Sequence, residues 1–576
     1  MVDDMILSAS GWRGIFAKNG DEESALPEIS REYELIVSAA AKVFSDYLSK
    51  NAPEKNAVVV GRDTRPTGEA ITDAVIRSLL SAGREVIHLG IAAAPEIMAF
   101  ARSCTSAAGF IYISASHNPI GHNGLKFGMT DGGVLQASEN AKLVAAFNTV
   151  IHSFTLPQKN TELENKVYAE IEINKKAALN AYSGFSNETV AGAELKKGIE
   201  KRPMSIAADF NGSARTVSID RDFFASLGLG FYAMNDIPGK IAHRIVPEGE
   251  SLEPCRAFIK EIRSKDPSVI LGYVPDCDGD RGNLIIWDEG LKRARALEAQ
   301  EVFALACLAE LSYLAWKGGI KKTALAVNDP TSLRIDRIAK VFGIPVFRAE
   351  VGEANVVGLA KKLREQGYLV RILGEGSAGG TIIHPSAVRD PLNTVCAILK
   401  LLAIDGVFKM WCEHSSQAYR YRDDFSLADV IASLPAFVST GSYSDDAVLK
   451  IKTSDHAVLK NEYQKIFLRQ WEEKKDLLLA QYRISGWDAI AYNGMTERRG
   501  IKNFGEAGKG GLKIEFFGSR APSEAVACIW MRGSATEPVF RIMADAESVD
   551  LERYLIQWQR QMVQKADLEL STNDAN

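Results

Sequence analysis

A strand followed by a polar loop and a helix recurs three times along this chain, and the repeat limits the folds that the chain can adopt. The first copy is the apolar strand Ala57–Val60, which leads into the loop Gly61–Arg65 and then into a helix with apolar residues at helical spacing. The second copy begins at strand 205–208 and the third at strand 323–327. Strands that alternate with helices predict α/β layers whose sheets are mostly parallel. In such sheets, ligands bind in the loops that follow the carboxyl ends of the strands.

The last part of the chain differs, because short strands follow one another before a final helix. Strands are predicted at 512–517, 525–531 and 538–543, and Ser548 is the expected N-cap of a helix with one apolar face. The predicted fold class is therefore α/β, with three successive α/β domains of mixed, mostly parallel sheets plus a C-terminal α+β domain. The tail after about Asp567 is expected to be disordered. The predicted domains are 1–195, 196–312, 313–420 and 421–576.

Composition excludes several functional classes. With 576 residues the chain is too long for a single core. A net charge of −5 over this length provides no field for nucleic acid or an anionic membrane, and we expect neither as a partner. The seven cysteines form no Cys-x-x-Cys pair, which argues against a disulfide framework or a zinc site. The first residues are acidic where a signal peptide is basic, and no apolar run reaches membrane-spanning length, so we predict a cytoplasmic protein.

The most informative single motif is the loop after the predicted strand Phe110–Ile113. It carries Ser116, His117 and Asn118, and Lys126 returns ten residues after the serine. A serine at the end of a core strand, next to an imidazole and an ammonium group, is placed to carry a reacting group. A turn with solvated side chains is the alternative that this motif alone leaves open.

Three aspartates at alternate positions follow the predicted strand 269–274. Asp276, Asp278 and Asp280 would repel one another by several kcal/mol at about 4 Å in an effective dielectric near 20. A divalent cation removes this repulsion, and oxygen-only ligands select magnesium, calcium or manganese. A calcium EF-hand loop is excluded, because its glycine and glutamate positions are occupied by Arg281 and Trp287. A solvated acidic turn remains the alternative.

A glycine-rich loop, 374–380, follows the predicted strand 368–373. It contains the Gly-x-Gly-x-x-Gly pattern of dinucleotide sites, but that pattern requires a helix to begin at once. The run 381–385 is instead extended and contains a proline, so the dinucleotide interpretation is not favoured. Glu375 and Ser377 suit hydrogen bonding to the hydroxyl groups of a sugar.

A dianion receptor is predicted after the strand 525–531. Two guanidinium groups, two hydroxyl groups and turn amides match phosphate, because the arginine fork binds its oxygens bidentately. Surface arginines on a polar turn are the alternative. The candidate clamp residues are Arg532, Ser534, Thr536 and Arg541.

These four motifs resemble those of the α-D-phosphohexomutase superfamily, which includes phosphoglucomutase and phosphomannomutase. The family's loops read Ala-Ser-His-Asn-Pro, Asp-x-Asp-x-Asp-Arg, Gly-Glu-x-Ser-Gly and Arg-x-Ser-Gly-Thr-Glu-Pro. The likeness covers roughly residues 8–560. It implies that Ser116 carries a transferable phosphate and that its oxygen shares one Mg²⁺ per chain with Asp276, Asp278 and Asp280.

The resemblance also implies roles for the other motif residues. Arg13, in the segment 11–16, would neutralise the transferring phosphoryl group together with Lys126, and Lys126 or His117 would transfer the proton. The clamp would hold the phosphate that is not transferred. The residues that would bind substrate are Arg281, Glu375, Ser377, Arg532, Ser534, Thr536 and Arg541.

The chain departs from the family pattern at three positions. Gly379 stands where relatives often have a histidine, Ala535 where they have a glycine, and Ala354 where they commonly have a lysine. Arg348 is a candidate to supply the charge that Ala354 lacks.

The resemblance predicts a magnesium-dependent phosphohexomutase that interconverts glucose 1-phosphate and glucose 6-phosphate. Glucose 1,6-bisphosphate would be the intermediate and activator, and the protein would be a monomer or a homodimer. A phosphomannomutase or dual-specificity mutase, a hexose 1,6-bisphosphate synthase and a non-catalytic sugar-phosphate-binding protein are the alternatives.

An Asp278→Asn variant is expected to lose activity but keep its fold, because a loop aspartate is expected at the surface.

Overall fold

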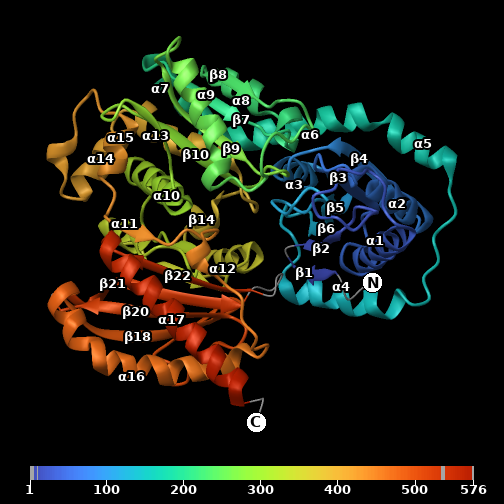
Figure 1. The fold of residues 1–576 in the computed structure, drawn as a ribbon. Helices are drawn as coiled ribbons and strands as arrows, with labels where there is room; N and C mark the ends of the chain where they lie inside the picture. Colours follow the sequence, from blue (N-terminus) through green and yellow to red (C-terminus); the bar gives the residue numbers. More distant parts are fainter. Residues whose placement is uncertain (1–4, 10, 520, 534–538, 574–576) are drawn as a thin grey trace. The chain divides into compact units, whose positions relative to one another are not determined.

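The computed structural model of the protein describes residues 5–9, 11–519, 521–533 and 539–573. The chain divides into two compact units, which are described separately below (Figure 1). Unit 1 comprises Met1–Leu297, Gly380–Lys409 and Tyr421–Val430, and unit 2 comprises Glu298–Gly379, Met410–Arg420 and Ile431–Asn576. Two short helices, α14 (Val407–His414) and α15 (Leu427–Ala432), have residues in both units.

The first sheet of unit 1 is mixed, with the strand order β1-β2-β6-β5-β3-β4. The central strand β3 pairs in parallel with β4 and β5, whereas β5, β6, β2 and β1 follow one another in antiparallel pairs. The strands are β1 (Ile6–Ser8), β2 (Gly11–Ile15), β3 (Ala57–Arg62), β4 (Glu85–Ile91), β5 (Ala107–Ile113) and β6 (His122–Met129).

Helices cover both faces of this sheet, which explains why β3 reads as a continuous apolar run. Val58 and Val60 belong to a core cluster with residues of helices α1 and α2, and Val59 points to the other face, where residues of α3 and α6 pack. Figure 1 shows α1 and α2 beside this sheet. The helices of this region are α1 (Arg31–Asn51), α2 (Gly68–Ser81), α3 (Ala94–Ser103), α4 (Ala137–Val150), α5 (Thr161–Ala169), α6 (Ile171–Thr189) and α7 (Gly192–Lys201).

The second sheet of unit 1 has the order β11-β10-β9-β7-β8, with β7 parallel to both β8 and β9. Strand β9 ends at the three aspartates and returns as the antiparallel strand β10. The elements are β7 (Ser205–Asp209), α8 (Asp220–Ser226), β8 (Gly230–Met234), α9 (Glu253–Arg263), β9 (Val269–Pro275), β10 (Gly282–Asp288) and β11 (Arg293–Ala296). Strand β15 (Gly380–Ile383) and helix α13 (Pro391–Ala403) complete unit 1.

Unit 2 begins with a parallel arrangement around β12, which pairs with β13 and with β14. Its long helix α10 is apolar on almost all sides and buried along most of its length. The elements are α10 (Ala299–Trp316), β12 (Leu325–Asn328), α11 (Arg334–Val341), β13 (Val346–Ala349), α12 (Glu353–Glu365) and β14 (Ile372–Glu375).

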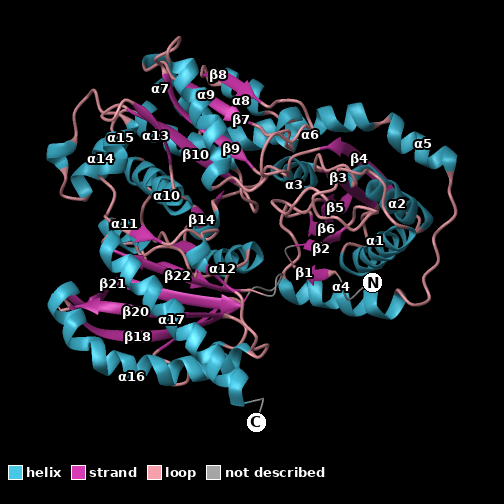
Figure 2. Ribbon diagram, in the orientation of Figure 1, coloured by secondary structure: helices cyan, strands magenta, loops and turns pink. Residues whose placement is uncertain are grey.

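The rest of unit 2 is an antiparallel sheet with two long helices packed on one face (Figure 2). Phe467 from α16 and Trp558 from α17 meet strand residues in one core cluster. The elements are β16 (Val438–Ser439), β17 (Val448–Leu449), α16 (His456–Tyr482), β18 (Ile484–Asn493), β19 (Thr496–Arg499), β20 (Gly511–Gly518), β21 (Ala521–Gly533), β22 (Phe540–Ala546) and α17 (Val549–Asn573).

The fold class predicted from the sequence is confirmed, and the domain limits stay a prediction. The expected disorder after Asp567 is wrong, because α17 continues to Asn573. The Asp567 carboxylate also accepts hydrogen bonds from the backbone amides of Lys452 and Thr453, which holds this end of the helix in place. None of the helices in the described part of the chain has the length and apolar character needed to cross a bilayer.

Two helix glycines give a matched test of the packing. A Cβ at Gly198 would lie 2.1 Å from the carbonyl oxygen of Ala403, whereas a Cβ at Gly184 would meet nothing within 4 Å. We expect Gly198→Ala to lower the free energy of unfolding by roughly 1–3 kcal/mol through overpacking. Gly184→Ala should raise it by up to about 1 kcal/mol through helix propensity. Urea unfolding of both variants checks this, and equal effects would contradict the packing.

A buried histidine predicts an acid-dependent loss of stability. Burial and the nearby Arg62 lower the pKa of His88 from 6.5 to about 4, and its ring packs edge-on against Tyr168. The unfolded chain therefore takes up a proton that the folded chain excludes, so stability falls as pH drops from 6.5 towards 4. At roughly 1.4 kcal/mol per pH unit, the loss reaches about 3 kcal/mol.

The measurement is the urea midpoint between pH 7 and pH 4.5 for the wild type, His88→Leu and His152→Leu. His152 is exposed and serves as the control. His88→Leu should flatten the acid dependence and His152→Leu should leave it unchanged. An unaltered profile in His88→Leu would contradict the assignment.

Candidate active site

Ser116 lies in the loop between β5 and β6 and is fully buried. Its Oγ donates a hydrogen bond of 2.6 Å to Asp276 Oδ2, and its amide donates to Ser114 Oγ at 2.8 Å. Its φ of +54° lies in the left-handed region, which costs a non-glycine residue about 1–2 kcal/mol. The loop therefore holds this hydroxyl in an unusual backbone conformation directly beside a carboxylate.

A fully buried arginine that the sequence analysis did not assign holds this loop. Arg65 Nη2 donates to the carbonyl oxygens of Ser116 at 2.7 Å and Asn118 at 2.6 Å, and Nη1 donates to that of His122 at 3.0 Å. Its Nε lies 3.2 Å from Asp63. The sequence places Arg65 in the polar loop after the first predicted strand, which could have indicated a functional residue. The carbonyl groups that Arg65 binds, however, lie about fifty residues further along the chain.

The three aspartates converge as predicted. Asp276, Asp278 and Asp280 are all buried, and one carboxylate oxygen of each lies within 4.8 Å of the others. Burial, followed by the charges of Asp278 and Asp280, raises the pKa of Asp276 well above its usual value. The Oδ1 atoms of Asp278 and Asp280 are buried without a hydrogen-bond partner among the described residues. Crowded and unsatisfied carboxylate oxygens fit a bound divalent cation. The expected surface position of Asp278 is wrong, because the side chain is fully buried.

Cationic side chains from other segments offset this negative charge. Lys126 Nζ lies 2.6 Å from Asp278 and 3.4 Å from Asp280, and Arg389 Nη2 lies 2.8 Å from Asp280. Burial opposes the charge on Lys126, but Asp278 and Asp280 raise its pKa overall. Arg389 was not predicted, because no motif surrounds it in the sequence.

Arg13 and His117 complete the centre. Arg13 Nη1 donates to Asn118 Oδ1 at 3.2 Å, and burial followed by Arg281 lowers the pKa of Arg13 to about 10, so it stays charged at neutral pH. His117 Nδ1 lies 3.5 Å from Ser116 Oγ. Burial, and then Arg281 and Arg13, hold the pKa of His117 well below its usual value. The ring is therefore neutral at neutral pH and lies beside the serine.

The charges around Ser116 suit a phosphoryl group. Four cationic side chains accompany three aspartates, so a divalent cation on the aspartates would leave a clear positive excess. A dianionic phosphoryl group would neutralise most of it. The cationic residues are Arg13, Lys126, Arg281 and Arg389.

A second unpredicted arginine supports the aspartate loop from behind. Arg215 is fully buried, and its Nε and Nη2 donate to the carbonyl oxygen of Gly279 at 3.0 and 2.8 Å. Gly279 has a φ of +68°, and a Cβ there would lie 2.7 Å from the Arg215 side chain. This guanidinium also donates hydrogen bonds to the side chains of Tyr182, Asp220 and Asp390.

In unit 2, the predicted sugar loop is held by an asparagine that the sequence analysis did not assign. Asn328 Nδ2 donates to Glu375 Oε1 at 3.4 Å and to Ser377 Oγ at 3.1 Å. The amide of Gly352 also donates to Glu375 Oε1, at 2.7 Å. A short 3₁₀ turn follows Glu375, whereas a dinucleotide site would need a helix to begin there.

The two clamp arginines that the structure describes also lie in unit 2. Arg532 and Arg541 face one another across the neighbouring strands β21 and β22. Ser534, Thr536 and the departure at Ala535 lie outside the described residues. The suggestion that Arg348 replaces a lysine at Ala354 is not supported, because its Nη1 and Nη2 bind Asp336 at 2.9 and 2.6 Å.

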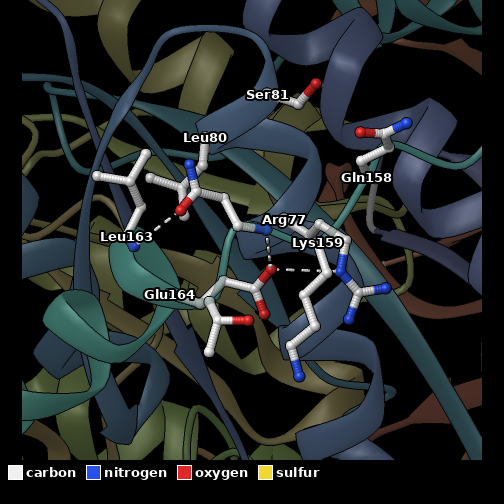
Figure 3. A pocket seen from close by; sticks show the side chains of 9 residues that line it. Arg77, Leu80, Ser81, Gln158, Lys159, Leu163 and Glu164 are labelled. Carbon is white, nitrogen blue, oxygen red and sulfur yellow. Dashed lines mark hydrogen bonds and ion pairs between the residues drawn. The ribbon is translucent and has the colours of Figure 1, made fainter.

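A pocket elsewhere in unit 1 contains none of the predicted site residues (Figure 3). It lies between α2 and the start of α5, and Figure 3 shows Arg77 and Glu164 pointing towards one another across it. Arg77 Nε lies 3.5 Å from Glu164, and Arg77 Nη1 lies 2.8 Å from Glu34. These ion pairs engage Arg77 and Glu164 with other protein groups.

The predicted residues therefore gather in two places. Unit 1 brings together the serine, the aspartates and the cationic side chains around them, whereas unit 2 contains the predicted sugar loop and the two described arginines of the predicted clamp.

Comparisons with known proteins identify relatives of this chain. Residues 6–152 match the family model described as phosphoglucomutase/phosphomannomutase alpha/beta/alpha domain I, and residues 302–419 match domain III of the same family. A protein of Thermococcus kodakarensis named phosphoglucomutase/phosphomannomutase is 29% identical over 397 residues, which are 68% of this chain and 78% of that protein. A phosphoglucosamine mutase of Levilactobacillus brevis is 26% identical over 379 residues, 65% of this chain and 76% of that protein. The crystal structure of a phosphoglucomutase/phosphomannomutase family protein from Burkholderia thailandensis has the same fold, with a TM-score of 0.64 and 18% identity over 97% of each chain.

The aspartate cluster gives a direct test by metal binding. Asp278→Asn keeps the shape of the side chain but removes a charged oxygen ligand, so we expect the affinity for Mn²⁺ to fall by about tenfold or more. Isothermal titration calorimetry measures this, with circular dichroism as the check of folding. Asp405→Asn is the control, because that exposed carboxylate pairs only with Lys201 among the described contacts. Equal Mn²⁺ affinity in both variants would contradict the metal site.

Proposed function

Because the chain belongs to the α-D-phosphohexomutase superfamily, we propose that it is a magnesium-dependent mutase that interconverts the 1-phosphate and 6-phosphate of a hexose. We further propose glucose as the sugar, glucose 1,6-bisphosphate as the intermediate and Ser116 as the residue that carries the phosphate.

One observation carries this proposal. Ser116 Oγ lies 2.6 Å from a carboxylate of the aspartate cluster, in a fully buried loop whose surroundings hold an excess of cationic side chains. A sugar-phosphate-binding protein has no need of a strained serine at this place. Phosphoryl transfer, in contrast, depends on positioning and on charge neutralisation, which these residues supply.

In the proposed transfer, the side chains around Ser116 act in one step. The phosphoserine Oγ–P bond breaks while a sugar hydroxyl oxygen bonds to the same phosphorus atom. The proton of that hydroxyl passes to His117, whose Nδ1 lies 3.5 Å from Ser116 Oγ, and from His117 to the serine oxygen as that oxygen leaves. Lys126 and Arg13 stay charged and balance the phosphoryl oxygens. The return of the second phosphate of the bisphosphate to Ser116 reverses these changes and completes the isomerisation.

The residues that would hold the metal are Asp276, Asp278 and Asp280, with Ser116 beside them. When bound, Mg²⁺ would neutralise charge on the transferring phosphoryl group.

Three sugars are candidates for the hexose of the substrate. Glucose follows from the likeness of the sugar loop to the family pattern. Mannose follows from the relative named phosphoglucomutase/phosphomannomutase, and glucosamine, which the sequence analysis did not consider, follows from several relatives named phosphoglucosamine mutase. We further propose a cytoplasmic location and a monomer or homodimer.

The test combines intact mass with turnover. The purified wild-type chain, treated with glucose 1,6-bisphosphate and Mg²⁺, should gain the mass of one phosphoryl group. Ser116→Ala should not gain it, and its mutase rate should fall roughly 10⁴-fold because the covalent acceptor is gone. Ser153→Ala, at an exposed serine, is the matched control and should behave as the wild type.

Turnover of the three hexose 1-phosphates then selects the sugar. Full activity of Ser116→Ala would overturn the proposed chemistry. Activity that depends on an added stoichiometric phosphoryl donor would indicate a bisphosphate synthase, and binding without turnover would indicate a non-catalytic protein.

A further inference from the structure

Two positive charges face one another at the predicted phosphate clamp. Arg532 on β21 and Arg541 on β22 are direct cross-strand partners, and like charges in this position repel. Each guanidinium therefore needs an acceptor that fixes its direction. The two acceptors belong to segments that also contact the sugar loop.

The first bridging segment contains Glu350. Its Oε1 accepts from Arg532 Nε at 3.0 Å and lies 2.9 Å from Nη2, while its Oε2 accepts from the amide of Gly494 at 2.7 Å. Two residues further on, the amide of Gly352 donates to Glu375 Oε1. This short stretch of backbone thus contacts a clamp arginine at one end and the glutamate of the sugar loop at the other.

The intervening residue makes this stretch rigid. The amide of Val351 donates to Asp329 Oδ1 at 2.9 Å, and Asp329 Oδ2 accepts from Trp530 Nε1 at 2.5 Å. Gly352 has a φ of +132°, which a residue with a side chain rarely adopts. The segment 350–352 is therefore fixed at each of its residues.

The second bridging segment contains Ser442. Its carbonyl oxygen accepts from Arg541 Nη1 at 2.9 Å, and its Oγ donates to the carbonyl oxygen of Ser377 at 2.5 Å. The Arg541 guanidinium also lies 5.7 Å from the ring centre of Tyr443. Ser442 thus repeats the pattern of the first segment, with a clamp arginine on one side and the serine of the sugar loop on the other.

We propose that Glu350 and Ser442 are positioning residues that tie each clamp arginine to one residue of the sugar loop. The inference rests on the proposed function and adds how its substrate, a hexose monophosphate, is recognised. The hydroxyl groups and the phosphate of the substrate would bind to groups held at one preset spacing. Glu350 also places a negative charge beside Arg532, which weakens the attraction of the clamp for free phosphate. Tight binding then requires the sugar and the phosphate in one molecule.

The experiment uses the full chain with Ser116→Ala as the parent, so that no chemistry occurs. Calorimetry measures the affinity for glucose 6-phosphate and for inorganic phosphate in the parent and in two further variants. Glu350→Gln keeps the side-chain shape but removes its charge. Ser442→Ala removes the hydroxyl contact with Ser377 and keeps the carbonyl that binds Arg541.

We expect each variant to weaken glucose 6-phosphate binding by about tenfold, because one charged or buried hydrogen-bonded contact is lost. The affinity for inorganic phosphate should not fall in either variant. A damaged clamp would instead weaken both ligands equally. Glu524→Gln is the matched control, because this glutamate on β21 pairs with Arg337 away from the sugar loop and should alter neither affinity.

Each outcome supports or overturns the positioning role of Glu350 and Ser442. Equal losses for both ligands, or unchanged glucose 6-phosphate affinity in both variants, would overturn the positioning role and leave the proposed function intact. If the parent binds none of the 6-phosphates of glucose, mannose and glucosamine, the proposed function fails and the inference fails with it.

Discussion

The burial of three carboxylates at one point is the constraint on which unit 1 depends. Asp276, Asp278 and Asp280 lie close together and are buried, so their negative charges would repel one another. Lysine and arginine side chains around them offset this repulsion. The same charges explain why a serine hydroxyl in a strained loop can lie against this cluster. In the proposed function a divalent cation and a dianionic phosphoryl group carry opposite charges, so both would occupy this site without changing its net charge.

The charged groups of unit 2 are arranged differently from those of unit 1. Two of its arginines are paired with carboxylates, Arg348 with Asp336 and Arg532 with Glu350. In the proposed function, specificity would then come from the geometry of hydrogen bonds. The family pattern has a lysine where this chain has Ala354, and the proposed bridging segments would hold the predicted substrate-binding groups in place without that charge.

The sequence was sufficient for features that local patterns determine. The alternation of strands and helices predicted α/β layers, and local motifs identified Ser116 and the aspartates as candidate site residues. Long-range partners were not predictable. Arg65, Arg215, Asn328 and Glu350 have no distinctive neighbours in the sequence, and their roles arise only when segments tens to hundreds of residues apart meet. Asp278 was expected at the surface for the same reason, because its partner Lys126 lies 152 residues away.

Crystals soaked in Mn²⁺ would test the central claim most directly, since the anomalous signal of manganese locates the ion without reference to activity. The account predicts one strong peak enclosed by the carboxylates of Asp276, Asp278 and Asp280 and next to Ser116 Oγ. Manganese bound elsewhere, with the three carboxylates still close together and no ion between them, would contradict it.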